Sequence, residues 1–375
     1  MKSARAIALE AMLRIEDGAF ANLVVPQLLG RSQLAERDRA FVTQLVYGAT
    51  RMRRACDWLI DQHVRPRGRA LDPTVRNALR LGAFQLAFLD TPPHAAVSET
   101  VGLAPQAARG FVNAVLRKLA SMPRPFRWPD LGTELSYPDW IVERLTKDLG
   151  AGAARQALMK MNEPPTVTER PDGYIQDQAS QWVADFVGTV ANETVADLCA
   201  APGGKATLMA ATGGLVVAGD VQPHRAALIK ANVGRLRLDN VDTVVADARR
   251  PPFRPATFDR ILIDAPCSGL GVLRRRPDAR WRMTADDVTQ LSALQRKLID
   301  GAIPLLRPGG RLVYSVCTMT SSETAAIDNW LADKHPQMKP APPPGKPWEP
   351  VGRGARLLPQ AADTDGMYVI ALTRK

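Results

Sequence analysis

The spacing of hydrophobic residues along the chain changes near residue 120. Before that point apolar residues recur at intervals of three and four, and the apolar–polar alternation typical of strands is absent. This spacing predicts amphipathic helices, and the clearest of them cover Ala6–Ile15, Arg39–Thr50, Thr74–Phe88 and Phe111–Leu119. We therefore expect an all-α domain over residues 1–125, with a break in the Arg-Pro-Arg-Gly stretch at 65–68.

Two proline-rich stretches follow, MPRPFRWPD at 122–130 and NEPPTVTERPDG at 162–173. Proline and glycine interrupt helices and strands, so both stretches predict connections. One helical pattern, Tyr137–Leu149, lies between them. Residues 126–172 are therefore predicted to form a linker and a connecting subdomain.

Beyond residue 173 short apolar runs alternate with helical patterns. The strand candidates are Thr194–Ala200, Gly214–Asp220, Asp242–Asp247, Phe258–Ala265 and Arg311–Cys317, and helical patterns lie between them. Apolar strands separated by helices are typical of a parallel sheet that is covered on both faces. Met367–Lys375 predicts a further strand at an antiparallel edge, and the proline-rich stretch 341–350 predicts an exposed insertion. We therefore expect a Rossmann-type α/β domain over residues 173–375.

The charge, the apolar runs and the cysteine and histidine content indicate which kinds of partner and site to expect. The chain has 49 basic and 38 acidic residues, and residues 1–125 hold 18 of the basic and 10 of the acidic ones. This excess favours a polyanionic partner such as RNA. No apolar run reaches the ~18 residues of a membrane span, and the N-terminus lacks the features of a secretory signal, so we expect a cytoplasmic protein. The four cysteines form no CxxC pair and the four histidines are scattered, which disfavours a metal site.

A glycine-containing loop, Asp197-Leu-Cys-Ala-Ala-Pro-Gly-Gly-Lys205, lies where the first predicted strand of the sheet gives way to a helix. Ligands of such sheets bind at the carboxyl ends of the strands. The loop matches neither a P-loop nor the GxGxxG pattern of dinucleotide sites. Asp220 and Asp247 close the next two strands, where they suit a ribose and an adenine amino group. Together these features indicate S-adenosylmethionine, although turn formation also explains either aspartate taken singly.

Two cysteines follow the fourth and fifth predicted strands, in Asp264-Ala-Pro-Cys267-Ser-Gly and Tyr314-Ser-Val-Cys317-Thr. If these strands are neighbours, ~4.8 Å apart, both thiols open onto the cofactor crevice. Methylation of carbon 5 of a cytosine needs such a thiol, because its addition to carbon 6 makes the ring nucleophilic. A second thiol can assist release of the product, and Asp264 can hydrogen-bond the exocyclic amine of the base. The base must be unstacked to be reached.

With these motifs the chain resembles the bacterial 16S ribosomal RNA cytosine-5 methyltransferases of the RsmB/Sun (Fmu) type, within the RNA 5-methylcytosine methyltransferase family. Residues 1–120 resemble the helical domain of the antitermination factor NusB. The resemblance implies methyl transfer from S-adenosylmethionine to carbon 5 of a cytosine in RNA, through a covalent cysteine adduct. The matching segments are QDQAS at 176–180, DLCAAPGGK at 197–205, DAPCSG at 264–269, GVLRRRPDARW at 271–281, YSVCT at 314–318, DGMYV at 365–369 and, in the NusB-like part, DRAFVTQLVYGATR at 38–51 and NALRLGAFQLAFLD at 77–90.

The resemblance also assigns roles to single residues. Cys317 is the expected nucleophile, Cys267 the thiol that helps to release the product, and Asp264 a further catalytic residue. Arginines 274–276 are expected either to grip RNA phosphate or to lie in a solvated loop, and Cys56 to be a packing residue. Cys199 is expected to contact the cofactor only through its backbone. The expected cofactor-binding residues are Cys199, Ala200, Ala201, Pro202, Gly203, Gly204, Lys205, Asp220, Asp247 and Asp264.

The chain departs from the family pattern at two places. The segment before QDQAS is short, where the family usually carries an RNA-binding strand–helix subdomain, and Glu323-Thr324 stands where Glu-Asn is often found. Two alternatives stay open. The second strand-end cysteine and the lack of a Glu-Asn-Val segment disfavour a DNA cytosine methyltransferase, and the intact cofactor loop disfavours a non-catalytic RNA-binding protein. We expect a monomer without a metal.

Overall fold

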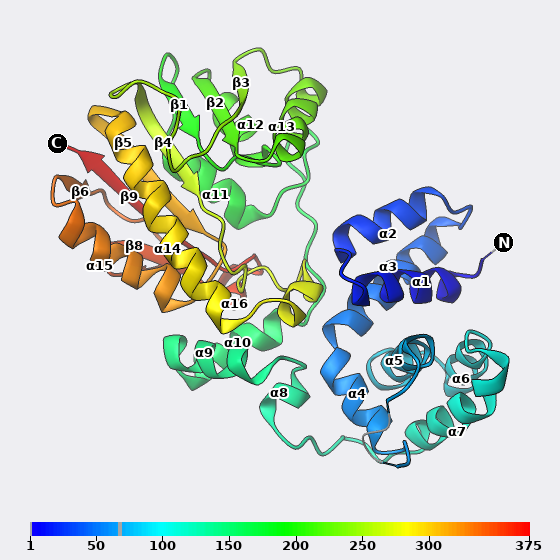
Figure 1. The fold of residues 1–375 in the computed structure, drawn as a ribbon. Helices are drawn as coiled ribbons and strands as arrows, with labels where there is room; N and C mark the ends of the chain where they lie inside the picture. The colour runs from blue at the N-terminus through cyan, green and yellow to red at the C-terminus, as the bar shows by residue number, and fades with distance from the viewer. Residues whose placement is uncertain (1, 67–69) are drawn as a thin grey trace. The chain divides into compact units, whose positions relative to one another are not determined.

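The computed structural model describes residues 2–66 and 70–375, which form two compact units (Figure 1). We call Met1–Glu143 with Leu273–Arg282 the helical unit, and Arg144–Val272 with Met283–Lys375 the sheet unit. The two units divide between Glu143 and Arg144, inside the helix Asp139–Leu149. The boundaries predicted from the proline-rich stretches were at residues 125 and 172. The predicted break at 65–68 lies partly outside the described residues.

The described part of residues 1–120 is helical, as predicted. Its central helix begins at Pro73, where the side chain of Asp72 accepts the backbone N–H groups of Thr74 and Val75. That helix, α5, packs against α1, α3, α4, α6 and α7. The helices up to residue 149 are α1 (Ala4–Glu16), α2 (Ala21–Gly30), α3 (Glu36–Arg51), α4 (Arg53–Asp61), α5 (Pro73–Phe88), α6 (Pro93–Val101), η1 (Gln106–Ala108), α7 (Arg109–Ala120), α8 (Leu131–Glu134) and α9 (Asp139–Leu149).

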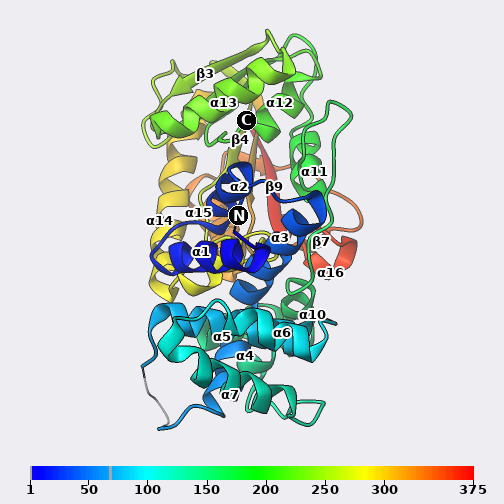
Figure 2. The ribbon, with the colours of Figure 1, turned by 90° about the vertical axis from the view of Figure 1, so that its right-hand side faces the viewer.

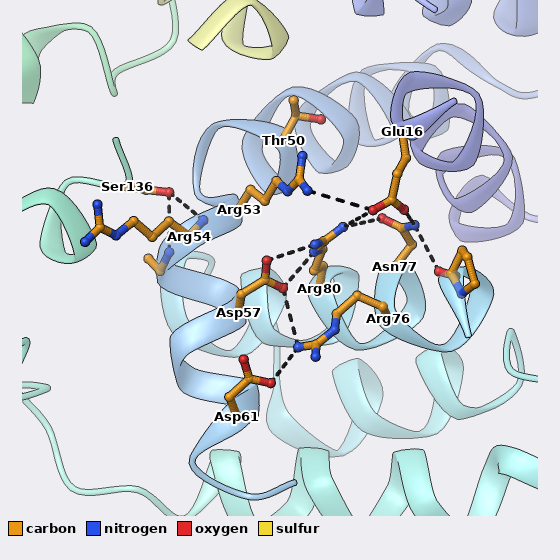
Figure 3. Close-up of polar contacts among 12 residues, drawn as sticks. Glu16, Thr50, Arg53, Arg54, Asp57, Asp61, Arg76, Asn77, Arg80 and Ser136 are labelled. Carbon is orange, nitrogen blue, oxygen red and sulfur yellow. Dashed lines mark hydrogen bonds and ion pairs between the residues drawn. The ribbon is translucent and has the colours of Figure 1, made fainter. Parts of the chain in front are cut away.

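A polar network ties three of these helices together (Figure 3). Arg80 on α5 is buried, and its Nε and Nη2 each donate to a carboxylate oxygen of Asp57 on α4 at 2.8 Å. Its Nη1 donates to Glu16 on α1 at 3.1 Å. A buried guanidinium needs such partners, because an unpaired buried charge is strongly destabilising. The network therefore fixes α1, α4 and α5 relative to one another.

The segment Leu273–Arg282 belongs to the helical unit although it follows the Cys267 loop in the sequence. Its Arg280 is buried and donates through Nη1 to the carbonyl oxygens of Arg51, at 3.2 Å, and Ser136, at 3.1 Å. The guanidinium of Arg280 also lies 3.9 Å from the ring centroid of Tyr137. These contacts make the segment an internal part of the helical packing.

Arg274 in the same segment corrects one expectation. Its side chain is buried, and its carbonyl oxygen accepts a hydrogen bond from Arg51 Nη2 at 2.8 Å. The hypothesis that Arg274 grips phosphate is therefore wrong for this conformation, because a buried side chain cannot meet a polyanion. Arg276, by contrast, is exposed.

The sheet unit contains one mixed sheet in the strand order β3-β2-β1-β4-β5-β9-β8-β7, with β6 also paired to β9. β1 to β5 are parallel, as predicted, and β4 and β5 are neighbours. The strands are β1 (Thr194–Asp197), β2 (Leu215–Asp220), β3 (Val241–Val245), β4 (Phe258–Asp264), β5 (Leu306–Val316), β6 (Met338–Pro340), β7 (Glu349–Val351), β8 (Gly354–Leu357) and β9 (Met367–Arg374).

The last strand is antiparallel, but its expected place at the edge of the sheet is wrong. β9 pairs with β5 on one side and with β8 and β6 on the other, and its residues from Met367 to Leu372 are buried. An apolar run that is buried on both faces suits an internal strand. The stretch 341–350 is likewise more than an exposed insertion, because Trp348 is buried and Glu349 begins β7.

Helices cover both faces of the sheet. α14 and α15 pack on one face and α11, α12 and α13 on the other, as Figure 2 shows for α14 and α11 on either side of β9. Among the described residues no helix is long and apolar enough to cross a membrane. Beyond α9, η2 (Pro277–Trp281) belongs to the helical unit. The helices of the sheet unit are α10 (Ala151–Lys160), α11 (Gln178–Val187), α12 (Gly204–Ala210), α13 (Pro223–Leu236), α14 (Ala285–Ala302), η3 (Ile303–Leu305), η4 (Ser321–Glu323), α15 (Ala325–Lys334) and α16 (Pro359–Ala362).

Candidate functional site

The predicted site residues gather at one edge of the sheet. β1, β2 and β4 end at Asp197, Asp220 and Asp264, and Cys317 directly follows the last residue of β5. Parallel strands bring their carboxyl ends to the same edge, which is where ligands of such sheets bind. Asp247 lies two residues beyond the end of β3, which is Val245.

The loop between β1 and α12 has two glycines, one favoured by backbone conformation and the other by close packing. Gly203 has a φ of +105°, a conformation that other residues rarely adopt, and Gly204 starts α12. A Cβ on Gly204 would lie 3.1 Å from the ring of Tyr174 and 3.2 Å from Gln176. The loop therefore runs close against the segment that contains QDQAS.

A pocket of about 170 Å³ lies beside this loop. Its walls include Asp197 and the QDQAS segment at Gln176 and Ser180. Asp220 and Asp247 lie outside its lining, and each forms an ion pair, with Arg225 at 2.9 Å and with Arg249 at 2.6 Å. The expected cofactor residues that line the pocket are Ala200, Ala201, Pro202, Gly204, Lys205 and Asp264.

Asp197 is a site residue that the sequence interpretation missed. Its side chain is buried, and Oδ2 has no hydrogen-bond partner in the described structure. Burial, together with the charges of Asp264 and Asp220, raises the pKa of this carboxyl to about 7. Its position as the first residue of the loop motif is the signal that could have identified it.

These residues fit S-adenosylmethionine. The ligand carries a sulfonium and an ammonium group, and the pocket offers the unpartnered Asp197 oxygen beside a second carboxylate, Asp264. Gly204, which lines the pocket without a side chain, allows close approach of the ligand to the backbone. No group of three or more His, Cys, Asp or Glu side chains among the described residues is arranged to hold a metal ion.

Asp264 is held by two donors. Lys205 Nζ lies 2.6 Å from Asp264 Oδ2, and Ser315 Oγ donates to Oδ1 at 2.6 Å. Burial alone would lower the pKa of Lys205, but the charges of Asp264, Asp197 and Cys317 outweigh burial and raise it. Lys205 is therefore an ammonium group, and its ion-pair partner is Asp264.

The two cysteines at the strand ends face each other. Their Sγ atoms are 3.2 Å apart and share one hydrogen bond, and both residues are partly exposed. The hydrogen bond to Cys317, followed by burial, raises the pKa of the Cys267 thiol well above its usual value. Cys267 is therefore protonated at neutral pH, and it is placed to donate to the Cys317 sulfur.

The other two cysteines lie apart from this pair. Cys56 is fully buried in the helical unit, as expected of a packing residue, and Cys199 packs against the core of the sheet unit. Burial raises the pKa of both thiols. Neither is suited to act as a nucleophile.

Comparison with known proteins identifies the family. Residues 186–373 match the family model of the 16S rRNA methyltransferase RsmB/F, and residues 2–121 match the NusB family. The probable ribosomal RNA small subunit methyltransferase B of Bacillus subtilis is 30% identical over 446 residues, covering 100% of this chain and 99% of that protein. The ribosomal RNA small subunit methyltransferase B of Thermus thermophilus is 34% identical over 402 residues, covering 99% and 97%.

A solved structure shows the same fold. The crystal structure of PH0851 matches with a TM-score of 0.82 at 23% identity, over 99% of both chains. The described geometry, with a methyltransferase sheet and a NusB-like set of helices, agrees with both family models. The chain therefore belongs to the 16S rRNA methyltransferase RsmB/F family, whose methyl donor is S-adenosylmethionine, and it carries a NusB-family helical domain before its methyltransferase domain.

Proposed function

We propose that the chain methylates carbon 5 of a cytosine in 16S ribosomal RNA through a covalent adduct with Cys317. The observation that carries the proposal is the Cys267–Cys317 pair, with sulfurs 3.2 Å apart beside the cofactor loop. Many methyltransferases share the sheet and the loop, but a pair of thiols is needed only where a base carbon must first be activated and then released.

Activation of the base begins at Cys317. Its thiolate adds to carbon 6 of the unstacked cytosine, which forms a C–S bond and makes carbon 5 nucleophilic. Lys205 is held beside the base site by its ion pair with Asp264, at 2.6 Å. Asp264 accepts a hydrogen bond from the exocyclic amine and so selects cytosine over uracil.

Release of the product uses Cys267. After methylation carbon 5 must lose its proton, the double bond between carbons 5 and 6 must re-form, and the C–S bond must break. We propose that the Cys267 thiol passes its proton to the departing Cys317 sulfur and takes up the proton of carbon 5. The hydrogen bond between the sulfurs supports this relay, because it already joins the two groups that exchange the proton.

The cofactor, when bound, supplies an electrophilic methyl group. The residues proposed to hold it are Asp197, the loop 199–205, Asp220, Asp247 and Asp264. Asp220 is suited to a ribose because it ends β2 beside the loop. Asp247 is suited to an adenine amino group because it follows β3 at the same edge of the sheet.

We further propose that the protein acts in the cytoplasm as a monomer, and that the basic residues 1–125 contribute to RNA affinity. An alternative, methylation of DNA, has less support because such enzymes use a single cysteine. The test is bisulfite mapping of 16S rRNA from a strain that lacks the protein. One cytosine should lose its methylation, and purified protein with S-adenosylmethionine should restore it. An unchanged map together with methyl transfer to DNA would contradict the proposal.

A further inference from the structure

The sheet unit holds a buried carboxylate that the proposed reaction does not use. Glu323, the last residue of η4, has no exposed surface. A charged group in such a place must have partners, because an unpaired buried charge is strongly destabilising. The identity of those partners indicates what this carboxylate does.

Glu323 accepts four hydrogen bonds. Its Oε1 accepts from the backbone N–H of Ser268 at 2.8 Å and from Nε2 of Gln295 at 3.1 Å. Its Oε2 accepts from the hydroxyls of Ser268, at 2.6 Å, and Thr320, at 2.8 Å. The donors come from the Cys267 loop, from α14 and from the turn after Cys317. One carboxylate thus joins three separate segments.

Two of those segments carry the paired thiols. Ser268 directly follows Cys267, and Thr318 directly follows Cys317. The hydroxyls of Ser268 and Thr318 are themselves 2.8 Å apart. The Glu323 carboxylate therefore holds Ser268, next to Cys267, against the segment that follows Cys317.

The charge of Glu323 acts on Cys267, one member of this pair. The pKa of Cys267 is raised first by the hydrogen bond to Cys317, then by burial, and further by the charges of Cys317 and Glu323. The titratable groups that interact with Cys267 include Cys317 at the end of β5, Tyr314 within β5 and Glu323 in η4. Both the hydrogen bonds and the charge of Glu323 thus act on the loop that carries Cys267.

We propose that Glu323 is a positioning residue of the methyltransferase site, whose carboxylate clamps the Cys267 loop onto the Cys317 loop. Its charge lies against the residue that follows Cys267, through the backbone N–H and hydroxyl of Ser268, and there it favours the thiol form of Cys267 that product release needs. The clamp stands on the contacts alone, and its catalytic purpose rests on the covalent function proposed above.

Two variants separate the clamp from the charge. In Glu323→Gln the amide oxygen can accept from the Ser268 N–H and from Gln295, and the amide N–H can donate to the hydroxyls of Ser268 and Thr320. This variant therefore keeps the hydrogen bonds and removes the charge. Glu323→Ala removes both. Glu349→Gln is the matched control, because Glu349 is an exposed carboxylate in the same unit.

The first measurement follows alkylation of Cys267 by iodoacetamide against pH, with each cysteine-containing peptide quantified by mass spectrometry. The expected midpoint falls by about half a pH unit or more in Glu323→Gln and stays unchanged in Glu349→Gln. The second measurement is capture of both thiols by phenylarsine oxide, which requires adjacent sulfurs. Capture should persist in Glu323→Gln and weaken about tenfold in Glu323→Ala.

An unchanged midpoint in Glu323→Gln would overturn the role of the charge, and undiminished capture in Glu323→Ala would overturn the clamp. If Glu323→Ala does not fold, Ser268→Ala replaces it, because it removes one hydroxyl donor to Glu323 and keeps the backbone N–H. Unweakened capture in Ser268→Ala would likewise overturn the clamp. Neither measurement uses RNA or cofactor. A failure of the protein to methylate cytosine would therefore contradict the proposed function without changing what the two measurements show about Glu323.

Discussion

Asp197 shows how a single buried residue makes stability depend on pH. Its carboxyl has a pKa of about 7 in the folded protein, against ~3.9 in an unfolded chain. Between these values the folded state binds a proton that the unfolded state has released, so stability falls as pH rises from about 4 to 7. The loss is on the order of 4 kcal/mol above pH 7. Asp197→Asn should remove this loss.

The measurement is urea unfolding of the ligand-free wild type and Asp197→Asn at pH 5 and pH 8. We expect the variant to be relatively more stable at pH 8 than at pH 5. An equal difference at both pH values would mean that Asp197 ionises normally in the folded state.

A second residue-level prediction concerns Asp220. Its carboxylate accepts from Arg225 Nε at 2.9 Å and from the backbone N–H of Gln222 at 3.0 Å, which fixes its orientation at the end of β2. If it also accepts from the ribose, Asp220→Ala should weaken S-adenosylhomocysteine binding by about 1.5–3 kcal/mol. Calorimetry measures this, with the exposed Asp242→Ala on β3 as control. Equal affinity of the two variants would make Asp220 only a turn residue.

Single residues were the most predictable part of the site. The strand-end positions of Asp220, Asp264, Cys267 and Cys317 followed from apolar runs that stop at polar residues. Asp197 and Glu323 were harder, because their importance comes from burial and from partners distant in the sequence. Glu323 appeared in the sequence only as part of a departure from the family pattern.

At the level of elements, the connection after the Cys267 loop depends on Gly271. Its N–H donates to the Cys317 carbonyl at 3.0 Å, and its own carbonyl accepts from the Gly366 N–H at 2.9 Å. A Cβ on Gly271 would lie 2.0 Å from the Gly366 oxygen, so a backbone segment would have to move. Gly271→Ala should destabilise the protein by about 1–3 kcal/mol or more and slow methyl transfer.

Gly234→Ala is the matched control for that prediction. Gly234 lies in α13, with nothing within 4 Å of an added Cβ, and alanine there should stabilise the helix by up to ~1 kcal/mol. The prediction is tested by comparing the two variants in denaturant unfolding and in the rate of methyl transfer. If Gly271→Ala behaves like Gly234→Ala, the close approach at Gly271 does not hold the Cys317 loop.

The elements also show where sequence patterns fail. The parallel strands were predicted because each is a continuous apolar run. The hairpin of β7 and β8 was missed, since the prolines at 342–344 and 347 suggested a loop and the strands are short. α2 was missed because Pro26 interrupts its helical pattern. In both cases tertiary packing outweighs local propensity.

At the scale of the whole molecule, the return of Leu273–Arg282 to the helical unit could not be predicted. Its arginines look solvated in the sequence, whereas Arg274 and Arg280 are buried among partners far away along the chain. Deletion of residues 1–120 would therefore remove the helices against which Leu273–Arg282 packs. A test of RNA binding by the helical unit must instead change surface charges.

The exposed Arg65 and Lys118 are suited to that test. Both residues act on His63: burial, followed by the charges of Lys118 and Arg65, lowers the pKa of its imidazole. The two cations therefore lie close to one another in the helical unit. If this patch contacts phosphate, the double variant Arg65→Gln/Lys118→Gln should reduce the slope of log K against log salt by about 1.4 for single-stranded RNA. Filter binding across salt concentrations measures the slope.

The control is Lys334→Gln/Lys339→Gln, which removes two exposed charges from the sheet unit. Its slope should match that of the wild type. Equal slopes in the two double variants would show that the helical patch does not contact the RNA.

The covalent mechanism is tested most directly by denaturing gels of Cys317→Ala, Cys267→Ala and the double variant after incubation with S-adenosylmethionine and substrate RNA. Cys267→Ala should still attack and methylate the base but stall before release, so a denaturant-resistant protein–RNA band should accumulate. Cys317→Ala and the double variant should give no band and no methyl transfer, although Cys317→Ala should still bind the cofactor. A band in Cys317→Ala and none in Cys267→Ala would reverse the two roles, and full activity in both single variants would contradict the covalent mechanism.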